Sequence, residues 1–346
     1  MAHVVRFAAP KVVELVDTEA LSPAAGEVGI RTLYSGISAG TELTAYVGSN
    51  PYLNLRWDDV ERLFTSGATS MTYPIDGWGY EEVGQIVSAG DGVDPACIGN
   101  IVWGLWGHRS DAVMPAEQAA AQRLPDSVDQ RAGIFARVGA VALNAVIDGD
   151  LHVGETVVIF GQGVIGLLAT RLAALSGARV IAVDAQPQRL EMSRHFGAEH
   201  VALVGRDAPA ELVRELTGGR GADVCIEMSG AYPALHEAVR TVGYAGRVVA
   251  SGFYQGGAGA LRLGEEFHHN RVEIIASQIS GAPTRYGNRW NKTRLHVEVM
   301  RLISEGKLDP LPLISHVLPA GSVADAFALV MQANPDVLQV VLDFRE

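Results

Sequence analysis

Three glycines and one acid form the most chemically informative pattern in the sequence. Gly161, Gly163 and Gly166 follow an apolar segment at 156–160, and Asp184 ends the next apolar segment. Gly161 permits a tight turn out of a strand, Gly163 lets backbone N–H groups approach a pyrophosphate, and Gly166 lets a helix pack closely against the sheet. A carboxylate such as that of Asp184 accepts hydrogen bonds from a ribose and repels a 2′-phosphate. The pattern therefore predicts a dinucleotide site that takes NAD rather than NADP.

The residues around these glycines complete the predicted phosphate site. Gln162, Val164 and Ile165 lie in the turn and at the start of an apolar helix. There, free backbone N–H groups and the positive end of the helix dipole face the phosphate charge. Arg189 follows shortly after Asp184, and an arginine in this loop can serve either cofactor. A glycine-rich turn in an ordinary α/β domain is the alternative, but the strand before the turn and the helix after it favour a cofactor site.

The elements that must position this turn alternate between strand and helix from about 141 to about 280, as a doubly wound parallel sheet requires. The strands that we expect are 156–160, 179–183, 200–204, 222–228, 246–251 and 272–278. The first 125 residues differ, with short alternating strands and frequent turn signals, and predict a β-rich domain of barrel-like character. The tail is expected to return to that domain through a helix near 293–305, a strand, a helix near 322–333 and a strand at 338–344.

Composition narrows the partners and the compartment. The 346 residues suffice for two cores, with 48% hydrophobic and 19% charged residues. A formal charge of −12 argues against nucleic acid as a partner, because phosphate backbones are held by Lys and Arg clusters. Cys97 and Cys225 alone exclude a disulfide framework and indicate a reducing compartment. We find neither a secretory signal nor a membrane span, and we expect a cytoplasmic protein.

The domain order and several local strings resemble the medium-chain dehydrogenase/reductase superfamily, which contains zinc alcohol and polyol dehydrogenases. The strings lie at 24–28, 35–42, 79–81, 99–102 and 313–319. The resemblance implies an α/β protein with a GroES-like catalytic domain at 1–140 and a Rossmann dinucleotide-binding domain at 141–282. It implies that 283–346 returns to the catalytic domain. It further implies a homodimer that pairs through the sheet edge at 272–278.

The catalytic zinc of that superfamily is held by a cysteine, a histidine and a third cysteine or acid. In this chain the cysteine turn carries Ser38, the histidine position is Tyr80, and the third position falls near Ala136 or Arg137. Neutral hydroxyls are poor zinc ligands compared with thiolate and imidazole. Two cysteines cannot form the family's four-cysteine structural zinc lobe either. We therefore expect no metal ligands and a zinc-independent protein.

Hydride transfer to or from an alcohol carbon needs a group that moves the hydroxyl proton and a group that stabilises the developing alkoxide. The candidates at the matching cleft positions are Ser38, Thr41, Tyr80, Glu81 and His108. Thr41 matches the family's proton-relaying Ser or Thr, and Tyr80 could donate to a carbonyl oxygen with Glu81 orienting its neighbours. Each also has a structural alternative. Ser38 and Thr41 could be turn hydroxyls, Tyr80 a packed ring and His108 a loop histidine, and Glu81 could form an ion pair with Arg137. An unorthodox zinc site of Glu81 and His108 is a further alternative.

The resemblance places further cofactor contacts at strand ends that face the cofactor cleft. These are Ser229, Gly252, Phe253, Gln278 and Gln339. In a loop at 281–290, Arg285 and Arg289 could hold a carboxylate, a phosphate or sugar hydroxyls, or the loop could be a plain linker.

We expect an NAD-dependent oxidoreductase that transfers hydride between nicotinamide and a secondary alcohol or ketone. Its small-molecule substrate would be a polyol, a sugar-like compound or a specialised metabolite. The alternatives are an NADPH-dependent quinone or enone reductase and a nucleotide-binding protein without turnover.

Overall fold

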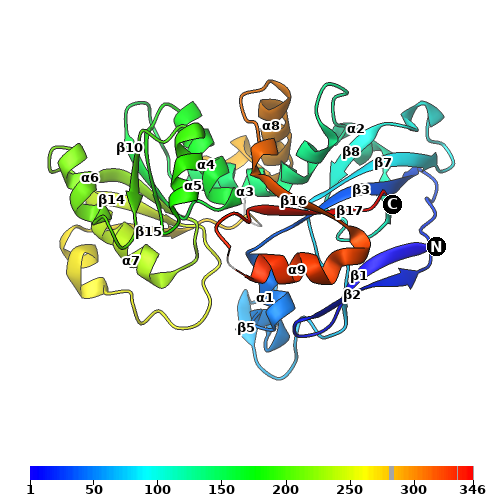
Figure 1. The fold of residues 1–346 in the computed structure, drawn as a ribbon, viewed down its shortest axis with the longest axis horizontal. Helices are drawn as coiled ribbons and strands as arrows, with labels where there is room; N and C mark the ends of the chain where they lie inside the picture. Colours follow the sequence, from blue (N-terminus) through cyan, green and yellow to red (C-terminus); the bar gives the residue numbers. More distant parts are fainter. Residues whose placement is uncertain (280–283, 333, 346) are drawn as a thin grey trace. The chain divides into compact units, whose positions relative to one another are not determined.

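The computed structural model describes residues 1–279, 284–332 and 334–345, and the chain divides into two compact units (Figure 1). Unit 1 comprises Met1–Arg137 and Asp309–Glu346, and unit 2 comprises Val138–Leu308. Of the loop at 281–290, residues 281–283 lie outside the described part of the chain. No helix within the described residues is long and apolar enough to cross a membrane.

Unit 2 is built on a parallel sheet with the strand order β12-β11-β10-β13-β14-β15. Every residue of β10 is buried, as expected for a central strand whose two faces are both covered. The order is that of a Rossmann fold, with the sheet built outward in both directions from β10. The strands are β10 (Thr156–Phe160), β11 (Arg179–Asp184), β12 (His200–Leu203), β13 (Ala222–Glu227), β14 (Val242–Ala250) and β15 (Glu273–Ala276).

Helices connect these strands and pack against them; α4, for example, packs on β10 and β11. The helices are α3 (Phe135–Asp148), whose first turn belongs to unit 1, α4 (Val164–Leu175), α5 (Pro187–His195), α6 (Pro209–Leu216), α7 (Tyr232–Thr241) and α8 (Lys292–Ser304). A π-helical turn at Leu263–Phe267 and a 3-10 segment, η5 (Thr284–Arg289), complete the unit.

Unit 1 is β-rich. One sheet has the order β2-β1-β6, a second runs β16-β17-β3-β7-β8 with β9 paired to β3, and β4 pairs with β5. The strands are β1 (Ala2–Ala9), β2 (Val12–Thr18), β3 (Glu27–Ile37), β4 (Arg56–Asp58), β5 (Leu63–Thr65), β6 (Ile75–Asp76), β7 (Glu82–Ala89), β8 (Ile101–Gly104), β9 (Asp111–Pro115), β16 (Ile314–Pro319) and β17 (Gln339–Asp343). The helical segments are α1 (Thr41–Val47), η1 (Pro51–Leu53), η2 (Pro95–Cys97), α2 (Ala116–Ala121), η3 (Gln130–Ile134), η6 (Leu311–Leu313), η7 (Ala320–Ser322) and α9 (Val323–Met331).

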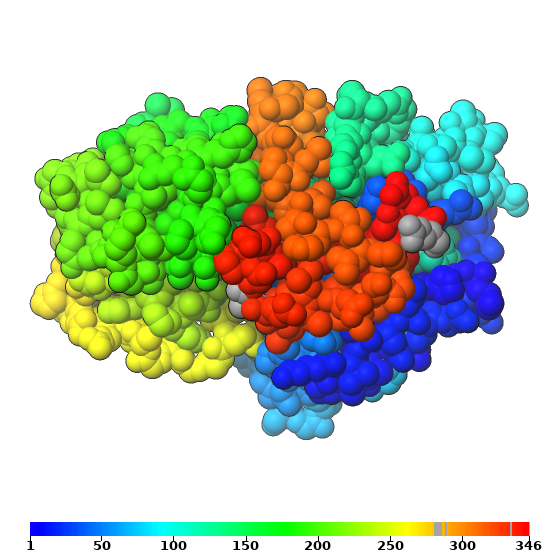
Figure 2. All heavy atoms as spheres, viewed as in Figure 1, coloured from blue at the N-terminus to red at the C-terminus, as the bar shows by residue number. Residues whose placement is uncertain are grey.

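The C-terminal tail completes unit 1. β17 pairs antiparallel with β3 and parallel with β16, so the last strand lies inside the second sheet. Phe327 of α9 packs edge-on against Phe7, with ring centroids 5.1 Å apart, in the core between α9 and the first strands. Figure 2 shows the red C-terminal segment against the blue N-terminal strands of this unit.

The units divide at positions that differ from the expected ones. The return to unit 1 begins at Asp309, later than the expected residue 283, because α8 packs within unit 2. Val299 of α8 lies so close to Gly139 of α3 that a Cβ at Gly139 would be 2.5 Å from Val299 Cγ1. The first boundary falls after Arg137, a few residues before the expected residue 140. A periodic helix pattern alone does not reveal which core the helix will join.

Candidate active site

Two short segments of unit 1 meet because β3 and β7 pair antiparallel. Ser35 of β3 lies opposite Glu82 of β7, so the turn after β3 and the residues before β7 are brought together. The Tyr80 hydroxyl donates to Ser38 Oγ at 2.6 Å. Thr41, at the start of α1, also hydrogen-bonds with the Tyr80 side chain. The structure thus groups Ser38, Thr41 and Tyr80, three of the predicted catalytic residues, at one place.

The Tyr80 phenol is held in its protonated form. Burial raises its pKa, and the nearby carboxyls of Glu42 and Glu81 raise it further. The hydrogen bonds with Ser38 and Thr41 only partly offset this rise. At neutral pH Tyr80 is therefore a hydrogen-bond and proton donor.

A buried hydrogen-bonded chain lies in the same unit. His108 Nε2 is 2.9 Å from Glu42 Oε2, and His108 Nδ1 is 2.6 Å from Ser35 Oγ, which donates to Glu82 Oε1 at 3.1 Å. Burial lowers the pKa of His108 to about 4, although the charge of Glu82 acts to raise it. Burial raises the pKa of Glu82 to about 7, although the charge of His108 acts to lower it. Burial also raises the pKa of Glu42 well above its usual range. At neutral pH the chain thus contains a neutral imidazole and at least one protonated carboxyl.

These hydrogen bonds change the role expected for His108. Its ring is fully buried, and both ring nitrogens already have partners within the protein. His108 is therefore a positioning residue for Glu42 and Ser35 rather than a group that touches substrate.

Glu81 is a buried acid that is poorly compensated. It is 1% exposed, and among the described residues the Gln339 amide is the side chain that stabilises its charged form. Burial and the charges of Glu42 and Glu82 raise its pKa well above the usual range, and the adjacent Gln339 amide offsets little of this. Gly36 makes room for both groups, because a Cβ there would lie 2.5 Å from Glu81 Oε2 and 2.8 Å from Gln339 Nε2. The expected alternative, an ion pair of Glu81 with Arg137, is not formed.

Arg137 carries an uncompensated positive charge. It lies half-buried in the first turn of α3, and its guanidinium makes neither a hydrogen bond nor an ion pair with a described residue. Burial lowers the pKa of Arg137, and the charge interaction with Tyr80 acts to raise it. A cation is also unfavourable at the positive end of a helix dipole. These costs to stability mark Arg137 as a functional candidate, whereas the sequence analysis named it only near the third zinc-ligand position and as a possible ion-pair partner of Glu81.

The glycine turn of unit 2 has the geometry that a phosphate site needs. Gly161 adopts a φ of 85°, and a Cβ at Gly166 would lie 1.8 Å from the Gly161 carbonyl oxygen. A Cβ at Gly163 would meet nothing within 4 Å, so the space beside this residue is open. Gly163, Val164 and Ile165 are partly exposed at the start of α4, where backbone N–H groups have no acceptor within the helix. The turn can therefore receive a pyrophosphate.

Asp184 and Gln162 fix this turn. Asp184 accepts hydrogen bonds from the backbone N–H groups of Gln162 at 2.6 Å and of Gln186 at 2.8 Å. The Gln162 side chain is fully buried, donates to the Ile159 carbonyl and accepts from Thr170. Gln162 is thus committed to the fold, whereas each Asp184 oxygen retains accepting capacity for a ribose.

Comparison with known proteins assigns the chain to a family. Residues 164–293 match the zinc-binding dehydrogenase family. The D-guloside 3-dehydrogenase of Escherichia coli (strain K12) is 28% identical over 336 residues, covering 95% of each chain. The L-threonine 3-dehydrogenase of Pyrococcus horikoshii is 29% identical over 333 residues, covering 88% of this chain and 87% of the relative. The 2R,3R-butanediol dehydrogenase of Bacillus subtilis shares the fold, with a TM-score of 0.79, 20% identity and 99% coverage of each chain.

The chain belongs to the medium-chain dehydrogenase/reductase superfamily. It is an oxidoreductase of the alcohol dehydrogenase type. Two further structures with the same fold contain nicotinamide cofactors: an alcohol dehydrogenase of E. coli CFT073 with NADH (TM-score 0.76, 22% identity, 99% coverage of each chain) and a putative zinc-binding dehydrogenase of Sinorhizobium meliloti with NADP (TM-score 0.78, 19% identity, 99% coverage of each chain).

The donors of this dehydrogenase do not fit the zinc of its family. The positions expected for zinc ligands carry a hydroxyl at Ser38, a phenol at Tyr80 and, at the third position, either the methyl group of Ala136 or the half-buried guanidinium of Arg137. Across the described residues, no group of three His, Cys, Asp or Glu side chains could hold a metal ion. The unorthodox pair of Glu81 and His108 lacks a free imidazole nitrogen.

The remaining predicted cofactor residues follow the carboxyl ends of strands, apart from Gln339. Ser229 follows β13 and is bonded to Glu227, while Gly252 and the 44%-exposed Phe253 follow β14. Gln278 is exposed after β15. Gln339 begins β17 in unit 1, where its amide donates to the carbonyls of Ile37 and Val340.

The sequence prediction missed three buried acids. Glu42 and Glu82 belong to the hydrogen-bonded chain of unit 1, and Glu227 ends β13 in unit 2. Glu227 accepts from the Tyr254 hydroxyl at 2.5 Å and from the Gly230 N–H at 3.0 Å. Two of these acids could have been found from the sequence, because Glu227 directly ends an apolar strand and Glu82 directly begins one.

Proposed function

We propose that this dehydrogenase is an NAD-dependent, zinc-independent enzyme that interconverts a secondary alcohol and its ketone in a polyol or sugar-like molecule. The observation that carries the proposal is the Tyr80–Ser38 hydrogen bond, which replaces metal ligands by a protonated donor. The name of the D-guloside relative supports a secondary alcohol on a sugar-like molecule. Unit 2 would hold the cofactor and unit 1 the reacting oxygen.

In the reductive direction, Tyr80 holds the proton that the product needs. When bound, NADH would supply a hydride to the carbonyl carbon. The Tyr80 hydroxyl donates its proton to the carbonyl oxygen, and Ser38 and Thr41 hold the phenol in place. Arg137 stabilises negative charge on the substrate oxygen and then on the phenolate. A proton taken up from solvent restores Tyr80.

The cofactor would be held by the turn of unit 2. The backbone N–H groups of Gly163, Val164 and Ile165 would bind the pyrophosphate, and Asp184 would accept from the ribose. The Arg189 Nε is buried without a hydrogen-bond partner among the described residues, which is the observation that favours the alternative cofactor, NADP. Titration of the intrinsic fluorescence of NADH and NADPH decides between them. We expect tighter binding of NADH, and tighter binding of NADPH would favour the quinone or enone reductase.

Turnover is tested with NADH deuterated at C4 and a panel of polyol-derived and sugar-derived ketones. Deuterium on the carbinol carbon of the product supports the proposed reaction. Binding of NADH without deuterium transfer to any ketone would favour a nucleotide-binding protein without turnover. Deuterium transfer to the β-carbon of enones instead would favour the enone reductase.

We further propose that the enzyme is a cytoplasmic homodimer. β15 is an edge strand of the sheet in unit 2, and its unpaired side can receive the same strand from a second copy. Light scattering would then give twice the chain mass of 36.7 kDa. A mass of 36.7 kDa at micromolar concentration would contradict the dimer.

A further inference from the structure

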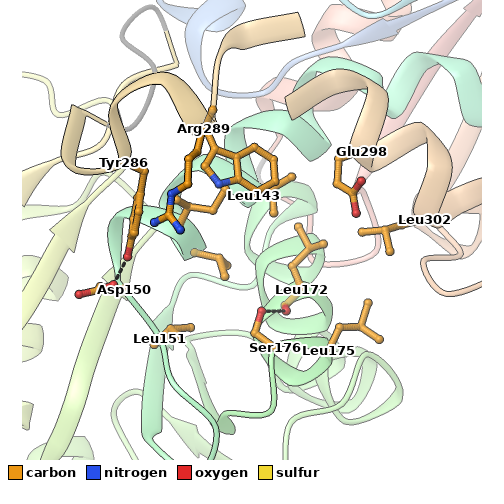
Figure 3. Close-up of a pocket in the computed structure, with 13 residues that line it drawn as sticks. Leu143, Asp150, Leu151, Leu172, Leu175, Ser176, Tyr286, Arg289, Glu298 and Leu302 are labelled. Atoms are coloured by element: carbon orange, nitrogen blue, oxygen red, sulfur yellow. Dashed lines mark hydrogen bonds between the residues drawn. The ribbon is translucent and has the colours of Figure 1, made fainter. Parts of the chain in front are cut away.

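A cavity of about 380 Å³ lies within unit 2, away from the glycine turn (Figure 3). It is lined by residues of α3, α4, η5 and α8. Leu172, Leu175 and Ser176 line it from the carboxyl end of α4, whereas Gly163 lies at the amino end. A helix rises 1.5 Å per residue, so these ends are about 18 Å apart. The cavity is thus distinct from the phosphate turn.

Part of the wall of this cavity is apolar. Leu143 and Val146 of α3, Leu172 of α4 and Leu302 of α8 line it, and each is less than 10% exposed. Leu175 stands at its edge with 40% exposure. A volume of this size with an aliphatic wall and a few polar groups is typical of small-molecule sites.

The acids at the cavity are neutralised by partners within the protein. Asp150 accepts a hydrogen bond from the Tyr286 hydroxyl and lies 3.9 Å from Arg247 Nη1. Glu298 is held by Arg301 through two contacts, at 2.6 Å and 3.0 Å. Neither carboxylate therefore needs a cation from a ligand.

One exposed cation at the cavity, Arg289, has no such partner among the described residues. The Arg289 guanidinium stacks 4.7 Å from the centroid of the Tyr286 ring, and it makes neither a hydrogen bond nor an ion pair with a described residue. Figure 3 shows it beside Tyr286, directed toward the cavity. A planar guanidinium that is stacked but unpaired presents its N–H donors to a carboxylate or sulfonate.

We propose that this cavity binds a small organic acid, with its anionic group on Arg289 and its apolar body against the leucine wall. The assignment does not depend on the hydride-transfer reaction. The ligand class follows from the Arg289 guanidinium, which is unpaired among the described residues, and from the aliphatic part of the lining.

The test uses 1-anilinonaphthalene-8-sulfonate, a fluorescent aromatic sulfonate, on the full-length protein in the presence of saturating NADH. We expect a fluorescence rise with one probe per chain. Arg289→Gln and Leu175→Glu should each weaken binding at least tenfold. The matched controls are Arg194→Gln, an exposed arginine of α5, and Val153→Glu, an 86%-exposed position outside the cavity. Both controls should bind as the wild type does.

The uncharged analogue N-phenyl-1-naphthylamine separates charge recognition from simple apolar binding. We expect it to bind at least tenfold more weakly than the sulfonate. Equal binding of the two probes, unchanged binding in Arg289→Gln, or no fluorescence rise in the wild type would each overturn the proposal. A fluorescence rise that is seen without NADH but not at saturating NADH would assign the probe to the cofactor site and overturn the proposal as well.

Discussion

At the scale of single residues, the proposed chemistry depends on Tyr80 and its surroundings. The phenol donates to Ser38, and the acids around it keep it protonated. A general acid typically contributes a factor of about 10² to 10⁴ to the rate. Tyr80→Phe removes only the hydroxyl, so we expect ketone reduction to slow at least about 100-fold.

The measurement is steady-state kinetics together with NADH affinity. The affinity should stay within twofold of the wild type, because Tyr80 lies in unit 1. Tyr244→Phe, at a 69%-exposed position in unit 2, is the matched control. An unchanged kcat in Tyr80→Phe would show that the Tyr80 hydroxyl is not the proton donor.

Arg137 is the second residue on which the proposed chemistry depends. Its charge is half-buried, unpaired among the described residues, and next to Tyr80. We expect Arg137→Met to lower kcat about 100-fold, as for the loss of one stabilising donor, and to raise the melting temperature or leave it unchanged. Arg137→Lys should recover part of kcat. A lower melting temperature with normal kcat would assign Arg137 a purely structural role.

At the scale of elements, β10, the glycine turn and α4 were predictable because their pattern is local. A β-branched run, three spaced glycines and an apolar helix follow one another in the sequence. The buried acids of unit 1 were not predictable in the same way. Glu42 and Glu82 become neighbours through His108 and Ser35 only when β3 pairs with β7, and a single sequence does not display such a pairing.

The two glycines at the turn allow fold and binding to be tested separately. A Cβ at Gly166 would collide with the Gly161 carbonyl, so Gly166→Ala should destabilise unit 2 by about 1–3 kcal/mol. A Cβ at Gly163 meets nothing, so Gly163→Ala should melt as the wild type does and yet bind NADH at least tenfold more weakly. Calorimetry and NADH titration measure the two effects. Normal NADH binding by Gly163→Ala would place the pyrophosphate elsewhere.

Glu81 makes the stability of unit 1 depend on pH. Burial raises its pKa in the folded state, so folding takes up a proton once the unfolded carboxyl is ionised. The stability cost therefore grows as pH rises above the usual carboxyl range toward the raised pKa. Glu81→Gln removes this cost, and its gain in melting temperature should be larger at pH 8 than at pH 5. Glu117→Gln, an exposed change on α2, should show no such trend, and an equal gain of Glu81→Gln at both pH values would contradict burial as the cause.

At the scale of the whole molecule, the chain keeps the two-unit plan of its superfamily, with a C-terminal tail that returns to unit 1. The sequence indicated this plan through the change from β-rich to alternating patterns. It did not indicate that α8 stays with unit 2, because that depends on the contact of Val299 with Gly139. The plan places the predicted cofactor turn in unit 2 and the Tyr80–Ser38 pair in unit 1.

We propose that Tyr80 and Arg137 provide what zinc provides in other members of this superfamily. The most direct test measures zinc by mass spectrometry and ketone reduction with NADH on the same sample, before and after dialysis against a chelator. We expect full turnover with far less than one zinc per chain. One tightly bound zinc per chain, with turnover lost when it is removed and restored when it is returned, would show that zinc and not the Tyr80–Arg137 pair supports the reaction.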